Sequence, residues 1–165
     1  MTSITPFKIA IPDEKLERLK QKLALSDFAS DLDDCEPWLH GPPTKEINRL
    51  TQYWAHKYDW RKAEARLNEF PQFSAKIDVS GFGTYDVHFV HQKSARENAI
   101  PLLFVHGWPG SFIEVTKILP ELVKGDGEGP SFHVVAPSLI DFGFSSPSGK
   151  VSKLNRCDQS GLTVV

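Results

Sequence analysis

A short apolar run at residues 100–105 constrains the fold of this chain more than any other segment. Continuous apolar runs of this length are typical of strands that are covered on both faces, as in parallel sheets. Residues 132–136 form a second such run, and parallel strands require a crossover connection, usually a helix. The sequence therefore predicts a right-handed strand–helix–strand unit within a mostly parallel sheet, which makes the fold class α/β.

The segment between the two runs carries helix signals. Ser111 and Glu114 have the spacing of a capping box, in which the two side chains bond backbone N–H groups of the first turn. Apolar residues then recur on one helical face, at Phe112, Val115, Leu119 and Leu122. We expect one helix that Pro120 ends or kinks, followed by a glycine-rich connection at residues 124–130.

The chain before residue 100 changes its periodicity near residue 72. Apolar and polar residues alternate over residues 73–79 and 85–89, on either side of the turn residues 81–83, and this predicts an antiparallel hairpin. The preceding part has helical spacing instead. We expect a helix after Pro12, a second helix with Thr44 as its N-cap, and a third that Asp59 caps and Pro71 stops.

The chain has 165 residues, which corresponds to one domain at roughly 150 residues per domain. We divide it into an N-terminal helical segment at residues 1–72, the first strands of a core at 73–147, and an atypical tail at 148–165. The tail is expected to be disordered or loosely attached, because it is polar and has no apolar periodicity of helical length. The tryptophans Trp38, Trp54 and Trp60 are interpreted as packing anchors, with a partner surface as the alternative.

Charge and composition exclude several classes of protein. Nineteen Lys and Arg against 21 Asp and Glu give a net charge of −2, which favours neither nucleic acid nor an anionic membrane as a partner. No apolar stretch approaches the roughly 18 residues of a membrane span, and the N-terminus lacks signal-peptide features. Cys35 and Cys157 are too few for a disulfide scaffold, and Cys35 is interpreted as a free structural thiol. We expect a soluble, cytoplasmic protein.

No sequence pattern indicates a cofactor or a metal. The six histidines lack zinc-type spacing with cysteine or carboxylate residues, and His88 and His91 are assigned to strand pairing. Gly81-Phe82-Gly83 begins like a dinucleotide-binding fingerprint, but it joins two strands and not a strand and a helix. We therefore expect neither a cofactor nor a metal.

Chemistry is expected at the turn His106-Gly107-Trp108-Pro109-Gly110, which follows the first apolar run directly. Such a turn places free backbone N–H groups at the carboxyl end of a parallel sheet, where α/β sheets bind ligands. These groups could form an oxyanion hole, in which fixed N–H dipoles stabilise charge that develops in the transition state. Gly107 would allow close approach, and Pro109 would stiffen the turn. Spacing alone leaves a simple strand-to-helix turn equally open.

Several separate motifs resemble those of microsomal-type epoxide hydrolases, in the right order over about residues 7–147. They are Trp60-Arg61-x-x-Glu64-x-x-Leu67-Asn68-x-x-Pro71-Gln72-Phe73, Val87-His88-Phe89-Val90-His91, His106-Gly107-Trp108-Pro109-Gly110-Ser111-Phe112 and Val135-Ala136-Pro137-Ser138-Leu139. The resemblance implies an α/β-hydrolase whose N-terminal helical segment packs around the sheet and lid. It also implies a detoxifying activity: an aspartate attacks an epoxide carbon to form an ester, two lid tyrosines donate protons to the opening oxygen, and a histidine with an acidic partner activates the hydrolytic water.

Only part of that machinery maps onto this sequence. By the resemblance, the backbone N–H of Trp108 is one oxyanion-hole donor, the bond before Pro109 is cis, and His106 braces the loop, with Gly107 and Pro109 as further supporting residues. The nucleophile motif Gly-Gly-Asp-x-Gly of the family does not occur, and neither does the serine motif G-x-S-x-G. Asp141 follows the wrong strand and is interpreted as a loop carboxylate.

Three hypotheses follow. The first is an N-terminal fragment of an epoxide hydrolase that is inactive alone and acts on a small-molecule epoxide in the complete enzyme. The second is a non-catalytic binding or regulatory module that pairs with itself or with a complete hydrolase through the exposed apolar sheet edge at residues 102–105. The third is that the tail after Pro147 arises from a gene-prediction error or a frame change.

Overall fold

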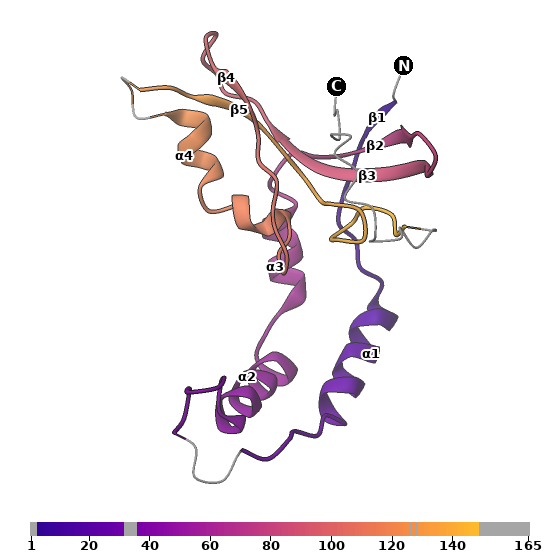
Figure 1. The fold of residues 1–165 in the computed structure, drawn as a ribbon, viewed down its shortest axis with the longest axis vertical. Coiled ribbons are helices and arrows are strands. Elements are labelled where there is room, and N and C mark those ends of the chain that lie inside the picture. The colour runs from indigo at the N-terminus through magenta and orange to yellow at the C-terminus, as the bar shows by residue number, and fades with distance from the viewer. Residues whose placement is uncertain (1–2, 32–35, 126, 128, 149–165) are drawn as a thin grey trace. The chain divides into compact units, whose positions relative to one another are not determined.

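The computed structural model describes residues 3–31, 36–125, 127 and 129–148. The chain forms two compact units, which are described separately below. The helical unit is Ile9–Glu69, and the sheet unit combines the chain up to Lys8 with the chain from Phe70 onward (Figure 1). Cys35, Cys157 and most of the expected polar tail lie outside the described residues.

The described part of the helical unit contains α1 (Asp13–Ala24), α2 (Thr44–His56) and α3 (Trp60–Leu67). Asp59 caps α3 as predicted, since its side chain accepts a hydrogen bond from the Lys62 N–H at 3.2 Å. The predicted N-cap of α2 is wrong by one residue, because Thr44 is already helical and Pro43 precedes it. The Thr44 N–H is satisfied from the preceding loop, where Asp31 Oδ1 accepts it at 2.7 Å.

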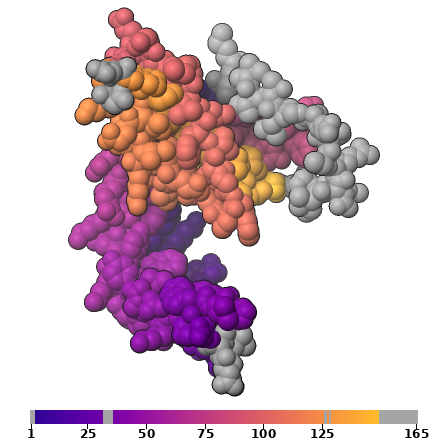
Figure 2. Space-filling model, turned by 60° about the vertical axis from the view of Figure 1, so that its left-hand side comes forward, coloured from indigo at the N-terminus to yellow at the C-terminus, as the bar shows by residue number. Residues whose placement is uncertain are grey.

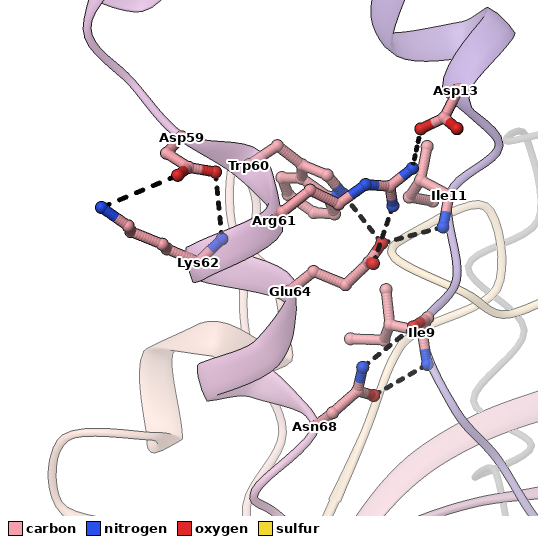
Figure 3. Close-up of polar contacts among 9 residues, drawn as sticks. All are labelled: Ile9, Ile11, Asp13, Asp59, Trp60, Arg61, Lys62, Glu64 and Asn68. Atoms are coloured by element: carbon pink, nitrogen blue, oxygen red, sulfur yellow. Dashed lines mark hydrogen bonds and ion pairs between the residues drawn. The ribbon is translucent and has the colours of Figure 1, made fainter.

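The residues that lead into α1 are fixed to α3 by side-chain hydrogen bonds (Figure 3). Glu64 Oε2 accepts from the Ile11 N–H at 2.8 Å and from Trp60 Nε1 at 2.9 Å. The Asn68 side chain accepts from the Ile9 N–H and donates to the Ile9 carbonyl, both at 2.9 Å. The hydrogen bond from Ile11, followed by those from Trp60 and Arg61, holds the pKa of Glu64 below its usual value. Trp60, Glu64 and Asn68, which belong to one sequence motif, thus all take part in these hydrogen bonds, with Trp60 as a donor to Glu64.

α1 and α2 leave their apolar faces largely uncovered. Neither helix contains a buried residue, and Trp54 on α2 is 46% exposed. Trp38, in the loop between them, is 65% exposed. The interpretation of these two tryptophans as packing anchors is therefore wrong, because no described residue covers them fully.

Within the described residues, the sheet unit is one mixed sheet in the order β1-β2-β3-β5-β4. Its strands are β1 (Ile4–Pro6), β2 (Gln72–Val79), β3 (Gly83–Gln92), β4 (Ile100–Leu103) and β5 (Phe132–Pro137). The predicted hairpin is confirmed as the antiparallel pair of β2 and β3, and the predicted parallel pair is confirmed as β4 and β5. β1 was not predicted, because its short sequence has no period and only its pairing with the distant β2 makes it a strand.

The connection between β4 and β5 is not the single helix that was predicted. A short 3-10 helix, η1 (Phe112–Val115), is followed by a separate helix α4 (Leu119–Lys124). Pro120 lies in the first turn of α4, so it begins this helix and does not end one. The physical reason is that proline lacks an N–H and its ring excludes a preceding helical turn, whereas both features suit a first turn.

Apolar residues of this connection pack on one face of the sheet. Phe112, Val115 and Leu119 are at most 1% exposed, and Val90, Val134 and Ala136 of the sheet are fully buried. The surface of η1 and α4 appears in orange in the space-filling view (Figure 2). The predicted capping box is confirmed, because both of its hydrogen bonds are present between Ser111 and Glu114.

β4 is shorter and more exposed than its apolar sequence predicted. It ends at Leu103, and Ile100, Leu103 and Val105 are each about half exposed, at 50–52%. The expectation of a strand covered on both faces is not met within the described residues, because the side chains of Ile100 and Leu103 stay about half exposed there. In this part of the chain β4 pairs with β5 (Figure 1).

Candidate functional site

The turn at residues 106–110 lies at the carboxyl end of β4. The neighbouring β5 runs parallel to β4 and ends at Pro137. Residues 138–139 therefore leave the sheet beside the turn, at the carboxyl ends of the two strands. This is the position where open α/β sheets bind ligands. The sequence therefore placed the candidate turn correctly relative to the sheet.

The buried side chain of His106 connects the two loops. His106 is 3% exposed, and its Nε2 accepts a hydrogen bond from the Leu139 N–H at 3.1 Å. Its Nδ1 lies 3.0 Å from the carbonyl oxygen of Gly107, so the tautomer with a proton on Nδ1 satisfies both contacts. Phe142 contacts the edge of the ring, with centroids 5.3 Å apart. Because both ring nitrogens are engaged, the geometry favours a bracing role over a general base.

Trp108 follows β4 in this turn, and its side chain is exposed to solvent. The residue is 84% exposed, and the peptide bond between Trp108 and Pro109 is cis, as expected. Among the described residues, none accepts a hydrogen bond from the Trp108 N–H. An N–H group in this condition is available to an oxyanion.

Two glycines of the turn have different surroundings. A Cβ at Gly107 would meet no atom within 4 Å, so the described residues supply no close neighbour that requires glycine there. A Cβ at Gly110 would lie 2.8 Å from the Gly107 carbonyl oxygen and 1.8 Å from Glu114 Oε1. The glycine that the packed turn requires is therefore Gly110, which the sequence interpretation did not single out.

A second buried histidine, His88 on β3, contacts Ser138, the residue that follows β5. His88 is fully buried, with Nδ1 2.9 Å from Ser138 Oγ and Nε2 2.9 Å from Gln72 Oε1. Since the Gln72 oxygen can only accept, Nε2 donates and Nδ1 accepts from the Ser138 hydroxyl. Burial lowers the pKa of His88 to about 4, so the imidazole is neutral at pH 7. The sequence predicted a strand position for His88 but gave no sign of this hydrogen-bonded network.

Asp141 lies in the loop that follows β5. It adopts a left-handed conformation with φ 71°, and its carboxylate accepts from the N–H and the hydroxyl of Ser148, both at 2.7 Å. The Ser148 N–H and then its hydroxyl hold the pKa of Asp141 below its usual value. These contacts fit the interpretation of Asp141 as a loop carboxylate.

The described ranges contain neither a metal-binding cluster nor a membrane-spanning helix. No group of three or more His, Cys, Asp or Glu side chains there has the geometry to hold a metal ion. Likewise, none of the helices in this part of the chain combines the length and the apolar character needed to cross a membrane.

Comparison with known proteins identifies relatives of most of the chain. A family profile described as "Epoxide hydrolase N terminus" matches residues 4–115, more than half of the chain. The chain is 44% identical over 146 residues to an inferred epoxide hydrolase of Stigmatella aurantiaca, covering 86% of this chain and 32% of that protein. It is 38% identical over 150 residues to juvenile hormone epoxide hydrolase 2 of Ctenocephalides felis, covering 90% and 32%.

A solved structure gives the same result. The epoxide hydrolase of Aspergillus niger superposes with a TM-score of 0.70 at 35% sequence identity, covering 93% of this chain and 38% of that one. The chain thus spans about a third of the length of the relatives it matches. The sheet of the described residues corresponds to part of an α/β-hydrolase fold.

Proposed function

The chain belongs to the epoxide hydrolase family, and we propose that it supplies the N-terminal part of a hydrolase that converts an epoxide to a vicinal diol through an aspartyl ester. In this proposal the Trp108 N–H is one of the oxyanion-hole donors. It stabilises the negative charge that develops on the ester carbonyl oxygen when water attacks it. Removal of reactive epoxides in the cytoplasm is the setting we propose.

The unengaged Trp108 N–H at the carboxyl end of β4 is the observation that carries this proposal. His106 supports it by holding the turn against the loop after β5, through the bond from Leu139 to Nε2. A donor fixed in this way needs no reorganisation when charge develops, which is why such donors contribute to catalysis. Gly107 and Pro109 would support the turn on either side of Trp108.

The 165 residues alone are not expected to hydrolyse epoxides. The sequence contains no Gly-Gly-Asp-x-Gly motif, so the aspartate that would form the ester has no counterpart in it. We expect a simple aryl epoxide such as styrene oxide to be consumed no faster with this chain than in a protein-free blank. Turnover above the blank that a Trp108→Pro variant lacks would contradict this expectation.

A chimera tests the oxyanion donor directly. Residues 1–147 of this chain replace the corresponding region of the Aspergillus niger enzyme, and styrene oxide hydrolysis is measured. Trp108→Pro removes the N–H and should lower kcat about 100- to 1000-fold, the usual effect of losing one oxyanion donor. Trp108→Ala is the matched control, which keeps the N–H and should retain most of the rate because the indole is exposed.

The two variants decide the role of the backbone group. Circular dichroism first establishes that both chimeras keep their fold. If Trp108→Pro then loses no more activity than Trp108→Ala, the Trp108 N–H is not an oxyanion donor. If both variants lose activity equally, the exposed indole and not the backbone is the functional group.

A non-catalytic binding module is the second candidate function. The exposed edge at β4 favours it, because an unpaired strand edge can accept another strand. Activity of the chimera would favour the hydrolase over this alternative, since a module adapted only for binding has no need of an intact oxyanion turn.

A further inference from the structure

We propose that Ser145 is a positioning residue for the oxyanion donor, and that it acts on the Trp108 N–H through a series of linked hydrogen bonds. The proposal rests on the proposed function, because it concerns how the structure prepares the same N–H group. Every contact of the series lies within the sheet unit. This hydrogen-bond series links Ser145, Leu139, His106 and Trp108, in that order.

The series begins at the hydroxyl of Ser145, in the loop after β5. Its Oγ donates to the Ser138 carbonyl at 2.7 Å and accepts from the His88 N–H of β3 at 3.0 Å. A hydroxyl has one proton, so these two contacts fix the direction in which it donates. The Ser138 N–H also donates to the His88 carbonyl at 2.8 Å. Ser145 and β3 together therefore determine the orientation of the Ser138 carbonyl.

The second step passes through the peptide unit between Ser138 and Leu139. In a planar trans peptide unit the C=O and the N–H point in opposite directions, so fixing the Ser138 carbonyl also directs the Leu139 N–H. That N–H donates to His106 Nε2 at 3.1 Å. Because an N–H can only donate, Nε2 is the unprotonated nitrogen and the ring proton is on Nδ1. The loop after β5 thus selects the tautomer of His106.

The third step reaches the oxyanion donor. His106 Nδ1 lies 3.0 Å from the Gly107 carbonyl oxygen and donates its proton to it. The Gly107 carbonyl and the Trp108 N–H belong to one peptide unit, so the N–H is directed away from the imidazole. His106 is 3% exposed, so water competes little for its contacts. The buried ring therefore fixes the direction of the Trp108 N–H.

All the donors of the series point the same way, from Ser145 toward Trp108. Linked hydrogen bonds polarise one another, so a group that accepts a bond at one end becomes a stronger donor at the other. The Trp108 N–H is the last group of the series, and no described residue accepts a hydrogen bond from it. A donor that is fixed and polarised before the reaction suits a developing oxyanion.

The next residue, Ser146, provides a matched control. Its Oγ accepts from the Asp86 N–H at 2.9 Å and donates to the Asp86 carbonyl at 3.3 Å. Both serines are half-buried, and both connect the loop after β5 to β3. The contacts of the Ser146 hydroxyl with Asp86 do not include the Ser138 carbonyl. Loss of either hydroxyl should therefore weaken the loop, but only loss of the Ser145 hydroxyl should affect His106.

NMR of the full chain tests the series without requiring activity. Long-range proton–nitrogen spectra should show the His106 proton on Nδ1. Ser145→Ala should lower the ratio of the Nδ1–H to the Nε2–H tautomer about 10-fold, the effect of weakening one hydrogen bond. Ser145→Thr keeps the hydroxyl and should keep the wild-type ratio, as should Ser146→Ala. A wild-type proton on Nε2, or equal ratios in the two alanine variants, would overturn the proposal.

Kinetics of the chimera with the Aspergillus niger enzyme test the effect on catalysis. Ser145→Ala should lower kcat for styrene oxide about 10-fold with little change in KM, because a misplaced donor weakens binding of the transition state. Ser145→Thr should restore the rate, and Ser146→Ala should keep it.

The same chimera separates this inference from the proposed function. If Trp108→Pro abolishes activity and Ser145→Ala loses no more than Ser146→Ala, the positioning role of Ser145 is wrong and the proposed function stands. If Trp108→Pro has no effect, the proposed function is wrong and this inference fails with it.

Discussion

At the scale of single residues, the burial of His88 sets the protonation state of its imidazole. Rings of Phe7, Phe112 and Phe144 surround it, with centroids 4.9, 4.8 and 5.3 Å away, and Gln72 and Ser138 satisfy both nitrogens. These partners come from distant parts of the sequence. The alternating pattern therefore predicts that His88 lies in a strand, but it does not predict that the side chain is buried as a neutral imidazole.

Burial of His88 predicts a loss of stability in acid. Its pKa in the folded chain is about 4, below the ordinary 6.5, so between these values the unfolded chain binds a proton that the folded chain does not. The free energy of unfolding should therefore fall by about 3 kcal/mol as the pH drops from 6.5 to 4, at 1.4 kcal/mol per pKa unit. Urea unfolding across this range measures the effect.

A variant assigns that pH dependence to His88. His88→Gln should reduce the slope in this range, although it also lowers stability at pH 7. His56→Gln replaces an exposed histidine of α2 and should leave the slope unchanged. If the slope survives His88→Gln, another group is responsible for it.

At the scale of elements, the turn after β4 is defined by contacts that its sequence only partly shows. The spacing of Ser111 and Glu114 indicated the capping box, and the structure confirms it. The same Glu114 carboxylate occupies the space beside Gly110, a contact that depends on how the turn folds back. Pro120 differs, since a proline can end a helix or begin one, and the structure places it in the first turn of α4.

Alanine substitutions at the two turn glycines should have different effects. Gly110→Ala should lower the free energy of unfolding by about 1–3 kcal/mol, because the added methyl group overpacks the turn against the Gly107 carbonyl and Glu114. Gly107→Ala should change it by less than about 0.5 kcal/mol, since its Cβ would lie in open space. Chemical denaturation of both variants measures this difference, and equal losses would contradict it.

At the scale of the whole molecule, the two units differ in how much they bury. The sheet unit buries the apolar side chains of η1, α4, β3 and β5 together. In the helical unit the buried apolar side chains are Ile9 and Ala63, and α1 and α2 have none among the described residues. Local stability follows buried apolar contacts, so the units should not open with equal ease.

Hydrogen exchange should show this difference. Backbone amides in α1 and α2 should exchange about 100-fold faster than those in β3 and β5, because few buried contacts must break to open these helices. α3 should be intermediate, since the Glu64 and Asn68 hydrogen bonds tie it to the segment before α1. Equal protection of α1 and β3 would mean that the helical unit is stabilised by contacts other than these.

The sequence by itself determined most of the local elements and the family. Periodicity of three to four and of two residues is a property of neighbouring side chains, so the helices, the hairpin and the parallel pair were predictable, and so was the turn at His106 to Gly110. The resemblance to a family predicted the cis bond, which the structure confirms, and a bracing role for His106, which stays a prediction.

The tertiary structure decided what depends on distant partners. It assigned β1 to the sheet through pairing with β2, and among the described residues it leaves Leu103 and Val105 about half exposed although their apolar run is typical of covered strands. It likewise enclosed His88 between Gln72 and Ser138 and gave Gly110 its close neighbours. Burial and pairing depend on which segments meet in space, and a one-dimensional pattern does not contain that information.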